Sequence, residues 1–172
     1  QLPQKYFLFV GNREPKKNVD RLIAAYRFLK KRRSDVPALV LAGGARPWKN
    51  PSIVIDDVHE IGYIRRRHLP ALYAGSAGLI FPTLAEGFGL PVLEALASGA
   101  PVITTRAVPI PGIENVARIV DSNSTEEIAN AMEKLLDDPE ITNRARVEGP
   151  RFAAPFTWKR AAELMLELFV KK

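Results

Sequence analysis

The sequence predicts a single Rossmann-like α/β domain with three layers, in which a parallel sheet of about six strands lies between helices. Two observations predict this fold class. Short runs that are apolar throughout recur along the chain, which is typical of strands buried on both faces. Segments with helical spacing separate these runs, and such alternation favours a parallel sheet covered on both sides. A length of 172 residues suits one core, so residues 1–172 are treated as one domain.

Strands and helices alternate through the first half of the chain. The aromatic run from Tyr6 to Val10 stops at Gly11, as a buried first strand would. Residues 19–33 carry apolar side chains at helical spacing and end in basic residues, where the helix dipole favours positive charge. Further strands are expected at residues 38–42, 53–55 and 58–61, and a brief helix at residues 69–73.

Residues that start or stop regular structure mark the elements of the second half. The strand expected at 78–81 is closed by Pro82, and the helix expected at 90–98 is stopped by Gly99. The remaining elements are strands at 101–104 and 118–120, and helices at 125–136 behind the cap Ser124, at 140–152, and at 158–170 behind the cap Thr157.

Composition excludes several classes of protein. Apolar residues make up 47% of the chain and charged residues 26%, as in an average soluble domain, and no apolar run approaches the about 18 to 20 residues of a membrane helix. The absence of cysteine excludes disulfides, thiolate metal sites and a cysteine nucleophile. The net charge of +6 favours an anionic ligand, but the basic clusters lack the interleaved aromatics of single-strand binders, so nucleic acid is not expected as a partner.

Loops at one edge of the sheet are where function is expected, because doubly wound sheets bind ligands outside the carboxyl ends of their strands. The most informative loop, residues 86–94, joins the strand at 78–81 to the helix at 90–98. Its glycines permit close approach of the backbone to a ligand, and Pro91 suits a first helical turn because it has no N–H. Amides at a helix N-terminus form a ready site for a phosphate or pyrophosphate.

Two glutamates flank this turn at a spacing that suits a nucleotide sugar. Glu94 lies about 6 Å along the helix beyond the amides, where a carboxylate can accept hydrogen bonds from the hydroxyls of a ribose. Glu86 lies before the amides, at the sugar end of a pyrophosphate. Taken singly, Glu86 would be a solvated loop residue and Glu94 a glutamate that the helix dipole favours. Their combination with the glycines and Pro91 favours the nucleotide-sugar interpretation.

This combination of motifs resembles the retaining glycosyltransferases of the GT-B architecture, of the family 4 or group 1 type. The residues that carry the resemblance span nearly the whole chain and are Gly11, Lys17-Asn18, Ala42-Gly43-Gly44, Gly62-Tyr63, Leu69 to Tyr73, Glu86 to Glu94, and Ala95 to Ile103. The resemblance implies that the chain is the C-terminal, nucleotide-sugar-binding half of a GT-B enzyme. We expect the N-terminal, acceptor-binding domain of that enzyme to be absent from this chain.

The resemblance also implies roles for individual residues. Glu86 would face the transferred sugar and Lys17 would neutralise the diphosphate, and these are the catalytic candidates, while Glu94 would hold the ribose. The other residues expected to bind the donor are Gly11, Asn12, Arg13, Gly43, Tyr63, Ile64, Arg65, Gly87, Phe88, Gly89 and Leu90. Fixed cations and amides stabilise the charge that grows on a departing nucleoside diphosphate, so neither a metal nor another cofactor is expected.

The sequence departs from the family pattern in the first two loops. Relatives carry an arginine directly after the first glycine, where this chain has Asn12; either Arg13 or Lys16 replaces it at the diphosphate, or both are solvated. A helix usual after the Gly-Gly turn is replaced by residues 45–52, in which Trp48 is expected to cover exposed core.

A third departure is the basic cluster at residues 65–68, where relatives tend to be acidic. Positive charge at the start of a helix opposes the helix dipole, so the cluster calls for an explanation. Arg65 or Arg66 either stacks on the nucleotide base or meets an anionic acceptor, or the cluster is simply solvated.

These inferences predict a hexosyltransferase whose isolated donor domain binds nucleotide sugar without turning it over, since the cleft needs two domains. The Glu-Pro-Lys-Lys-Asn turn at residues 14–18 is similar to that of mannosyltransferase-like members that act on lipid-linked glycans. The expected donor is therefore GDP-mannose, the expected acceptor a membrane-associated lipid-linked glycan, and the expected location the cytoplasm, at the inner membrane face. The last helix would lean toward the partner domain and leave apolar surface exposed.

Three other classes compete with this interpretation. An NAD-dependent enzyme on the same fold needs a Gly-x-Gly-x-x-Gly turn, which residues 11–15 do not provide. A GT-B epimerase would lack the Gly-Phe-Gly-Leu-Pro run, and a GT-B phosphorylase would add a pyridoxal-binding lysine. A non-catalytic nucleotide-binding module is disfavoured because the site is intact.

Overall fold

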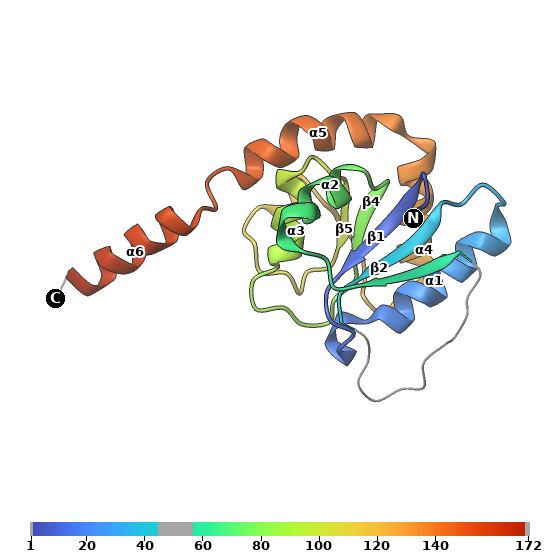
Figure 1. Ribbon diagram of the computed structural model, residues 1–172, viewed down its shortest axis with the longest axis horizontal. Helices are drawn as coiled ribbons and strands as arrows, with labels where there is room; N and C mark the ends of the chain where they lie inside the picture. Colours follow the sequence, from blue (N-terminus) through green and yellow to red (C-terminus); the bar gives the residue numbers. More distant parts are fainter. Residues whose placement is uncertain (1, 45–56, 171–172) are drawn as a thin grey trace.

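The computed structural model describes residues 2–44 and 57–170, which form a doubly wound α/β domain (Figure 1). Its sheet has six strands in the order β3-β2-β1-β4-β5-β6, and every pair of neighbours is parallel. The strands are β1 (Tyr6–Val10), β2 (Ala38–Ala42), β3 (Val58–Gly62), β4 (Gly78–Phe81), β5 (Val102–Thr104) and β6 (Arg118–Ile119). The predicted fold class is confirmed.

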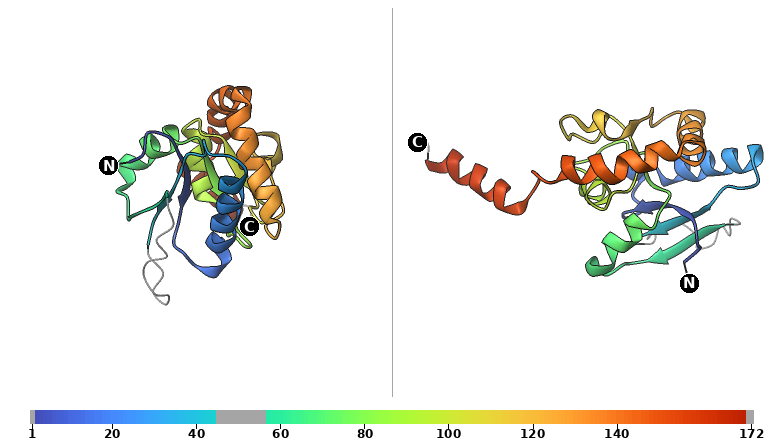
Figure 2. Two further views of the ribbon diagram at one scale, coloured as in Figure 1. Left: turned by 90° about the vertical axis from the view of Figure 1, so that its right-hand side faces the viewer. Right: turned by 90° about the horizontal axis from the view of Figure 1, so that it is seen from above.

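Helices cover both faces of this sheet, as the views in Figure 2 show. They are α1 (Val19–Arg32), α2 (Leu69–Ala74), α3 (Leu90–Ala97), α4 (Thr125–Asp137), α5 (Pro139–Ala153) and α6 (Trp158–Val170), with 3-10 turns at Pro15–Lys17, Arg66–His68 and Ile113–Asn115. Helix α1 packs beside α4, and α3 packs between α2 and α5. From β1 to β3 the strands are added toward one edge of the sheet, and from β4 to β6 toward the other edge. Because connections between parallel strands are right-handed, this reversal places the connecting helices of the two halves on opposite faces.

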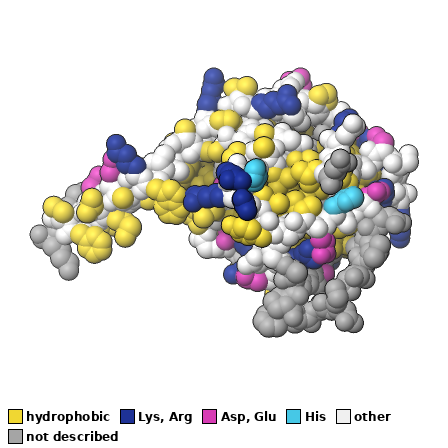
Figure 3. Space-filling model, viewed as in Figure 1, with side chains coloured by type: hydrophobic (Ala, Val, Ile, Leu, Met, Phe, Trp, Pro, Cys, Tyr) yellow, Lys and Arg dark blue, Asp and Glu magenta, His cyan; other side chains and the backbone are white. Residues whose placement is uncertain are grey.

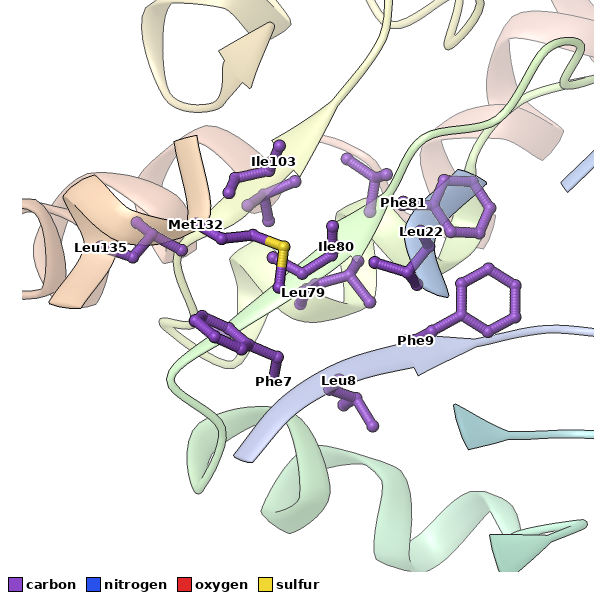
Figure 4. Close-up of a cluster of buried hydrophobic side chains, with 14 of the residues drawn as sticks. Phe7, Leu8, Phe9, Leu22, Leu79, Ile80, Phe81, Ile103, Met132 and Leu135 are labelled. Carbon is purple, nitrogen blue, oxygen red and sulfur yellow. The ribbon is translucent and has the colours of Figure 1, made fainter. Parts of the chain in front are cut away.

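The core lies on both sides of β1, whose central residues are fully buried. Figure 4 shows Phe7 on the same side of the strand as Met132 of α4, and Leu8 on the opposite side. Burying side chains of this size stabilises the fold by about 1.5–3 kcal/mol each. A strand that is apolar on both faces therefore has to be central, and the sheet order places β1 between β2 and β4.

Local sequence signals explain where several helices begin and end. Ser124 accepts a hydrogen bond from the amide of Glu127 at 3.1 Å, and Thr157 accepts one from Arg160 at 3.1 Å, so both predicted caps are confirmed. Gly99 follows α3 with a φ of 71°, a conformation that ends helices and that residues with a side chain adopt at a cost. The strand expected at residues 53–55 and the packing expected for Trp48 lie outside the described residues.

Helix α6 stands apart from the rest of the domain, projecting from the end of α5 (Figures 1 and 2). None of its residues is buried, and the side chains of Trp158 and Phe169 are 72% and 74% exposed. Hydrophobic side chains gather along one side of it in Figure 3. The expected apolar surface on the last helix is therefore present. No helix in the described ranges has both the length and the apolarity to span a bilayer.

Candidate functional site

The direction of strand addition reverses between β1 and β4, and doubly wound sheets bind ligands in the crevice outside the strand ends at such a point. Lys17 follows β1 and Glu86 follows β4, and their side chains form an ion pair across this junction. Both side chains are largely enclosed, with 12% and 14% of their surface exposed. Glu86 also accepts a hydrogen bond from the amide of Gly87 at 3.0 Å, and the ammonium of Lys17 lies 4.9 Å from the ring centre of Phe81. The two predicted catalytic residues thus share one site.

Hydrogen bonds between the loops fix the positions of Lys17 and Glu86 relative to each other. The amide of Leu84 donates to the carbonyl of Lys16 at 2.7 Å, which ties the loop after β4 to the loop after β1. The buried hydroxyl of Thr105 donates to the carbonyl of Thr83 at 2.7 Å, which ties in the loop after β5. The ion pair therefore rests on a braced junction.

Asn18 is the central brace of this junction. Its side-chain amide donates to the carbonyls of Pro82 at 3.1 Å and Ser122 at 2.7 Å, so one residue joins the loops after β1, β4 and β6. Its backbone is left-handed, with φ 57° and ψ 34°, a conformation that asparagine tolerates better than most residues. The Lys-Asn pair seen in the sequence thus combines a cation with the residue that fixes its position.

The turn before α3, residues 87–90, contains backbone amides without a protein acceptor. In the part of the chain that the structure describes, the amides of Phe88, Gly89 and Leu90 donate to no protein acceptor. Gly89 adopts a φ of 99°, and a Cβ atom there would lie 2.7 Å from a methyl carbon of Val108, so this position requires glycine. Phe88 and Leu90 are 43% and 45% exposed, whereas Gly89 between them is buried, so the turn is open at its flanks. The geometry suits a bound anion.

Glu94 lies one helical turn further along α3 and is partly buried. The hydroxyl of Tyr73, from α2, donates a hydrogen bond to its carboxylate at 3.0 Å. Burial raises the pKa of Tyr73, and the negative charge of Glu94 raises it further. Glu94 is thus partly exposed, and a hydrogen bond holds its carboxylate in place.

The glycines after β1 and β2 let the strand ends approach each other. A Cβ atom on Gly43, whose φ is 125°, would lie 2.2 Å from the carbonyl oxygen of Gly11, so no side chain fits there. The amide of Gly11 donates to Ala42 at 2.9 Å and the amide of Gly43 to Gly62 at 2.7 Å. Gly11 and Gly43 therefore have a structural role at the edge of the site, and Asn12 is exposed beside them.

The two cations that could replace the missing arginine are both engaged elsewhere in this structure. Arg13 forms an ion pair with Glu60 of β3 and is 10% exposed, and its Nε has no hydrogen-bond partner among the described residues. Lys16 pairs with Glu14 at 3.0 Å, and both side chains are about half exposed. Neither residue joins the pair formed by Lys17 and Glu86.

The loop after β3 carries the residues expected near the nucleotide base. Tyr63 is 82% exposed, Arg65 and Arg66 are exposed, and Ile64 is partly buried against the core. Arg67 donates from its Nε to the ring of His68 at 3.1 Å.

Sequence reasoning did not assign roles to Asn18, Tyr73 or Glu60, although it named the first two within motifs. Asn18 could have been suspected, because asparagine at the start of a helix is a common cap and tolerates the left-handed region. Tyr73 looks like an ordinary core residue on the apolar side of a short helix, so nothing local indicates its partner. No group of three or more His, Asp or Glu residues that could hold a metal ion occurs in residues 2–44 and 57–170.

Comparison with known proteins fits this geometry. Residues 1–151 match the family described as glycosyl transferases group 1. The O-antigen chain mannosyltransferase B of Escherichia coli is 32% identical over 165 residues, which cover 91% of this chain and 43% of that protein. Sucrose-phosphate synthase from Thermosynechococcus elongatus has a TM-score of 0.79 and 25% identity, over 99% of this chain and 47% of the other.

A second solved structure has the same fold. The C-terminal domain of a glycosyl transferase group 1 family protein from Francisella tularensis has a TM-score of 0.75 at 23% identity, covering 90% of this chain and 86% of that one. By contrast, the chain spans less than half the length of the Escherichia coli and Thermosynechococcus proteins. The family match over residues 1–151, with the paired glutamates and the amide turn lying in it, shows that the chain belongs to the group 1 glycosyltransferases.

Proposed function

We propose that this chain is the donor-binding domain of a retaining glycosyltransferase and that it binds the nucleoside diphosphate of a hexose donor. The observation that carries the proposal is the arrangement along the β1–β4 crevice. Unpaired amides at Phe88, Gly89 and Leu90 lie between the ion pair of Glu86 and an accessible carboxylate on Glu94. An anion site flanked by two carboxylates matches a pyrophosphate with a sugar at one end and a ribose at the other.

The chemistry follows from the charge that the reaction creates. Breaking the bond between the sugar and the phosphate leaves extra negative charge on the departing nucleoside diphosphate. The ammonium of Lys17 and the amides of the turn stabilise that charge because they are already fixed in place. Glu86 lies beside the sugar, where its carboxylate orients the donor or stabilises positive charge on the ring.

The ion pair between Lys17 and Glu86 suggests how the empty site is kept neutral. Two charges that are this enclosed would each be costly alone, so each compensates the other before a ligand arrives. A diphosphate brings its own negative charge to Lys17 and leaves Glu86 available to the sugar. Donor binding therefore exchanges one partner of Lys17 for another.

The proposed donor is GDP-mannose, and the proposed acceptor is a glycan or a lipid-linked glycan. The Escherichia coli relative is described as an O-antigen chain mannosyltransferase, which supports mannose. Because the chain covers less than half of that relative, we propose that an N-terminal half carries the acceptor site. The isolated chain is then expected to bind donor without turnover, and the whole enzyme to work in the cytoplasm at the inner membrane face.

Titration calorimetry of the chain with GDP, UDP, ADP and NAD tests this proposal. We expect a nucleoside diphosphate to bind and NAD not to bind. Glu94→Ala should weaken that binding by about tenfold or more, because it removes the acceptor of the ribose hydroxyls.

A matched control separates the ribose contact from a general loss of charge. Glu126 is exposed near the start of α4, so Glu126→Ala removes the same group from a second helix, away from the site. This variant should bind as the wild type does. Equal affinities for the wild type and Glu94→Ala, or binding of NAD alone, would contradict the proposal.

A further inference from the structure

Tyr73 is a buried tyrosine whose hydroxyl reaches the candidate site. It lies on α2, its side chain is fully buried, and its hydroxyl donates to Oε2 of Glu94 at 3.0 Å. Helices α2 and α3 pack beside each other on one face of the sheet (Figure 1). A residue 21 positions earlier in the chain thus touches the carboxylate assigned to the ribose.

The phenol of Tyr73 can serve only as a donor toward Glu94. Burial, followed by the negative charge of Glu94, raises the pKa of Tyr73, so the hydroxyl keeps its proton at neutral pH. A hydrogen bond from a neutral donor to an ionised carboxylate is stronger than one between neutral groups. The contact therefore fixes one oxygen of the carboxylate.

We propose that Tyr73 is a positioning residue for donor recognition: by holding Oε2 of Glu94, it orients the carboxylate so that Oε1 faces the two ribose hydroxyls. This inference rests on the proposed function, because it needs Glu94 to contact a ribose. It adds Tyr73 as a second residue through which the site distinguishes a ribose from a 2′,3′-dideoxyribose.

The orientation matters because a glutamate side chain is flexible. A free glutamate on a helix surface populates several rotamers, and fixing it on binding costs conformational entropy. Across residues 2–44 and 57–170, Glu94 makes no salt bridge, so the hydroxyl of Tyr73 is the side-chain contact that restrains its carboxylate. The hydroxyl of Tyr73 takes up one lone pair of Oε2, which leaves the other lone pairs of the carboxylate for the hydroxyls of a ligand.

The test compares GDP with 2′,3′-dideoxy-GDP, or the UDP or ADP pair if the wild-type chain binds that nucleotide instead. The dideoxy compound lacks the hydroxyls that Glu94 would accept from, so the ratio of the two affinities reports the ribose contact alone. Tyr73→Phe should weaken binding of GDP by about three- to tenfold and leave binding of the dideoxy compound unchanged. A role limited to stability would lower both affinities equally or neither.

Tyr6→Phe is the matched control, because it deletes the same atom from a second buried tyrosine anchored to the same helix. The hydroxyl of Tyr6 donates to the carbonyl of Leu72, the residue before Tyr73, at 2.8 Å. If loosening α2 were the cause of the effect, both variants would show it. We expect Tyr6→Phe to preserve the ratio of the GDP and dideoxy affinities, with thermal unfolding measured for both proteins.

A second variant covers the case in which Tyr73→Phe does not fold. Glu94→Gln keeps an oxygen for the hydroxyl of Tyr73, so a fixed side chain would turn its NH₂ group, a donor, toward the ribose hydroxyls. A hydroxyl can accept as well as donate, so this NH₂ group still bonds to the ribose, but without the charge of the carboxylate, and the ratio of the two affinities should fall below the wild-type value. A ratio that stays at the wild-type value in Glu94→Gln would show that the amide turns freely and would overturn the inference.

The outcomes separate this inference from the proposed function. A wild-type chain that binds no nucleoside diphosphate, or binds the GDP and dideoxy compounds equally, contradicts the ribose role of Glu94 itself. A wild-type chain that discriminates, together with a folded Tyr73→Phe that discriminates equally well, overturns only the role of Tyr73.

Discussion

At the junction of β1 and β4, Lys17 and Glu86 are only 12% and 14% exposed, whereas at the end of β3 Tyr63 is 82% exposed. The first region is braced by hydrogen bonds from Asn18 and between neighbouring loops. The second is an exposed tyrosine followed by exposed arginines. In the proposed function the first region holds the diphosphate and sugar, and the second lies near the base.

The difference indicates which part of the nucleotide sugar is bound by side chains that the fold already holds in place. A diphosphate has the same charge in every nucleotide sugar, so its partners can be fixed by the fold without limiting the choice of donor. Fixed partners also act more strongly, because they need no reorganisation when charge develops. Exposed side chains at the base end give up this advantage, since ordering them costs entropy and water screens their charge. We therefore expect substitutions in the braced region to have the larger effects.

The largest effect is expected for Lys17→Ala. The change removes the enclosed cation at the diphosphate and leaves Glu86 without its ion-pair partner, so GDP should bind about 10- to 100-fold more weakly in calorimetry. Lys16→Ala is the matched control, because that neighbouring lysine is exposed and pairs with Glu14 at 3.0 Å. Its affinity should stay within about twofold of the wild type. A large loss in Lys16→Ala with none in Lys17→Ala would show that the other lysine contacts the phosphate.

A smaller loss is expected for Gly89→Ala, which tests the amide turn. The φ of 99° and a contact of 2.7 Å with Val108 mean that a methyl group would distort the turn, so GDP should bind about tenfold more weakly. Gly87→Ala is the control in the same turn, because a Cβ atom there meets nothing within 4 Å and its φ is not positive. Equal affinities of both variants would contradict an anion site at these amides.

Most of the fold could be predicted from the sequence, because its signals are local. A strand such as β1 is apolar on both faces, and helices α4 and α6 begin directly after residues that cap them. The alternation of strands and helices predicted a parallel sheet covered on both faces, whereas the order of its strands came only from the structure. Bounds moved by a residue or two where ends fray, as at α3, which ends at Ala97 rather than Ser98.

From the residues alone, the site could be predicted only as far as they share one segment, whereas Lys17 was assigned through the family resemblance. Glu86, Gly89 and Glu94 are close in the chain, so their order along a turn and a helix indicates where a ligand would lie. The partners of these residues come from other loops: Lys17 is 69 positions from Glu86, and Tyr73 lies on a different helix from Glu94. A single sequence contains no signal for such pairs, because either residue alone is compatible with an ordinary surface or core position.

The smallest effect is expected at the base end, for the double substitution Arg65→Ala and Arg66→Ala. If one of these exposed arginines stacks on the base, GDP binding should weaken by about two- to threefold, since contacts of this kind contribute little where water competes. The loss should shrink further as salt is raised, because an exposed charge is screened, whereas the loss in Lys17→Ala should persist. Ribose 5-phosphate, which has no base, gives the control: its affinity should be the same in the wild type and the double variant. An unchanged affinity for GDP would show that the cluster is only solvated and takes no part in binding the nucleotide.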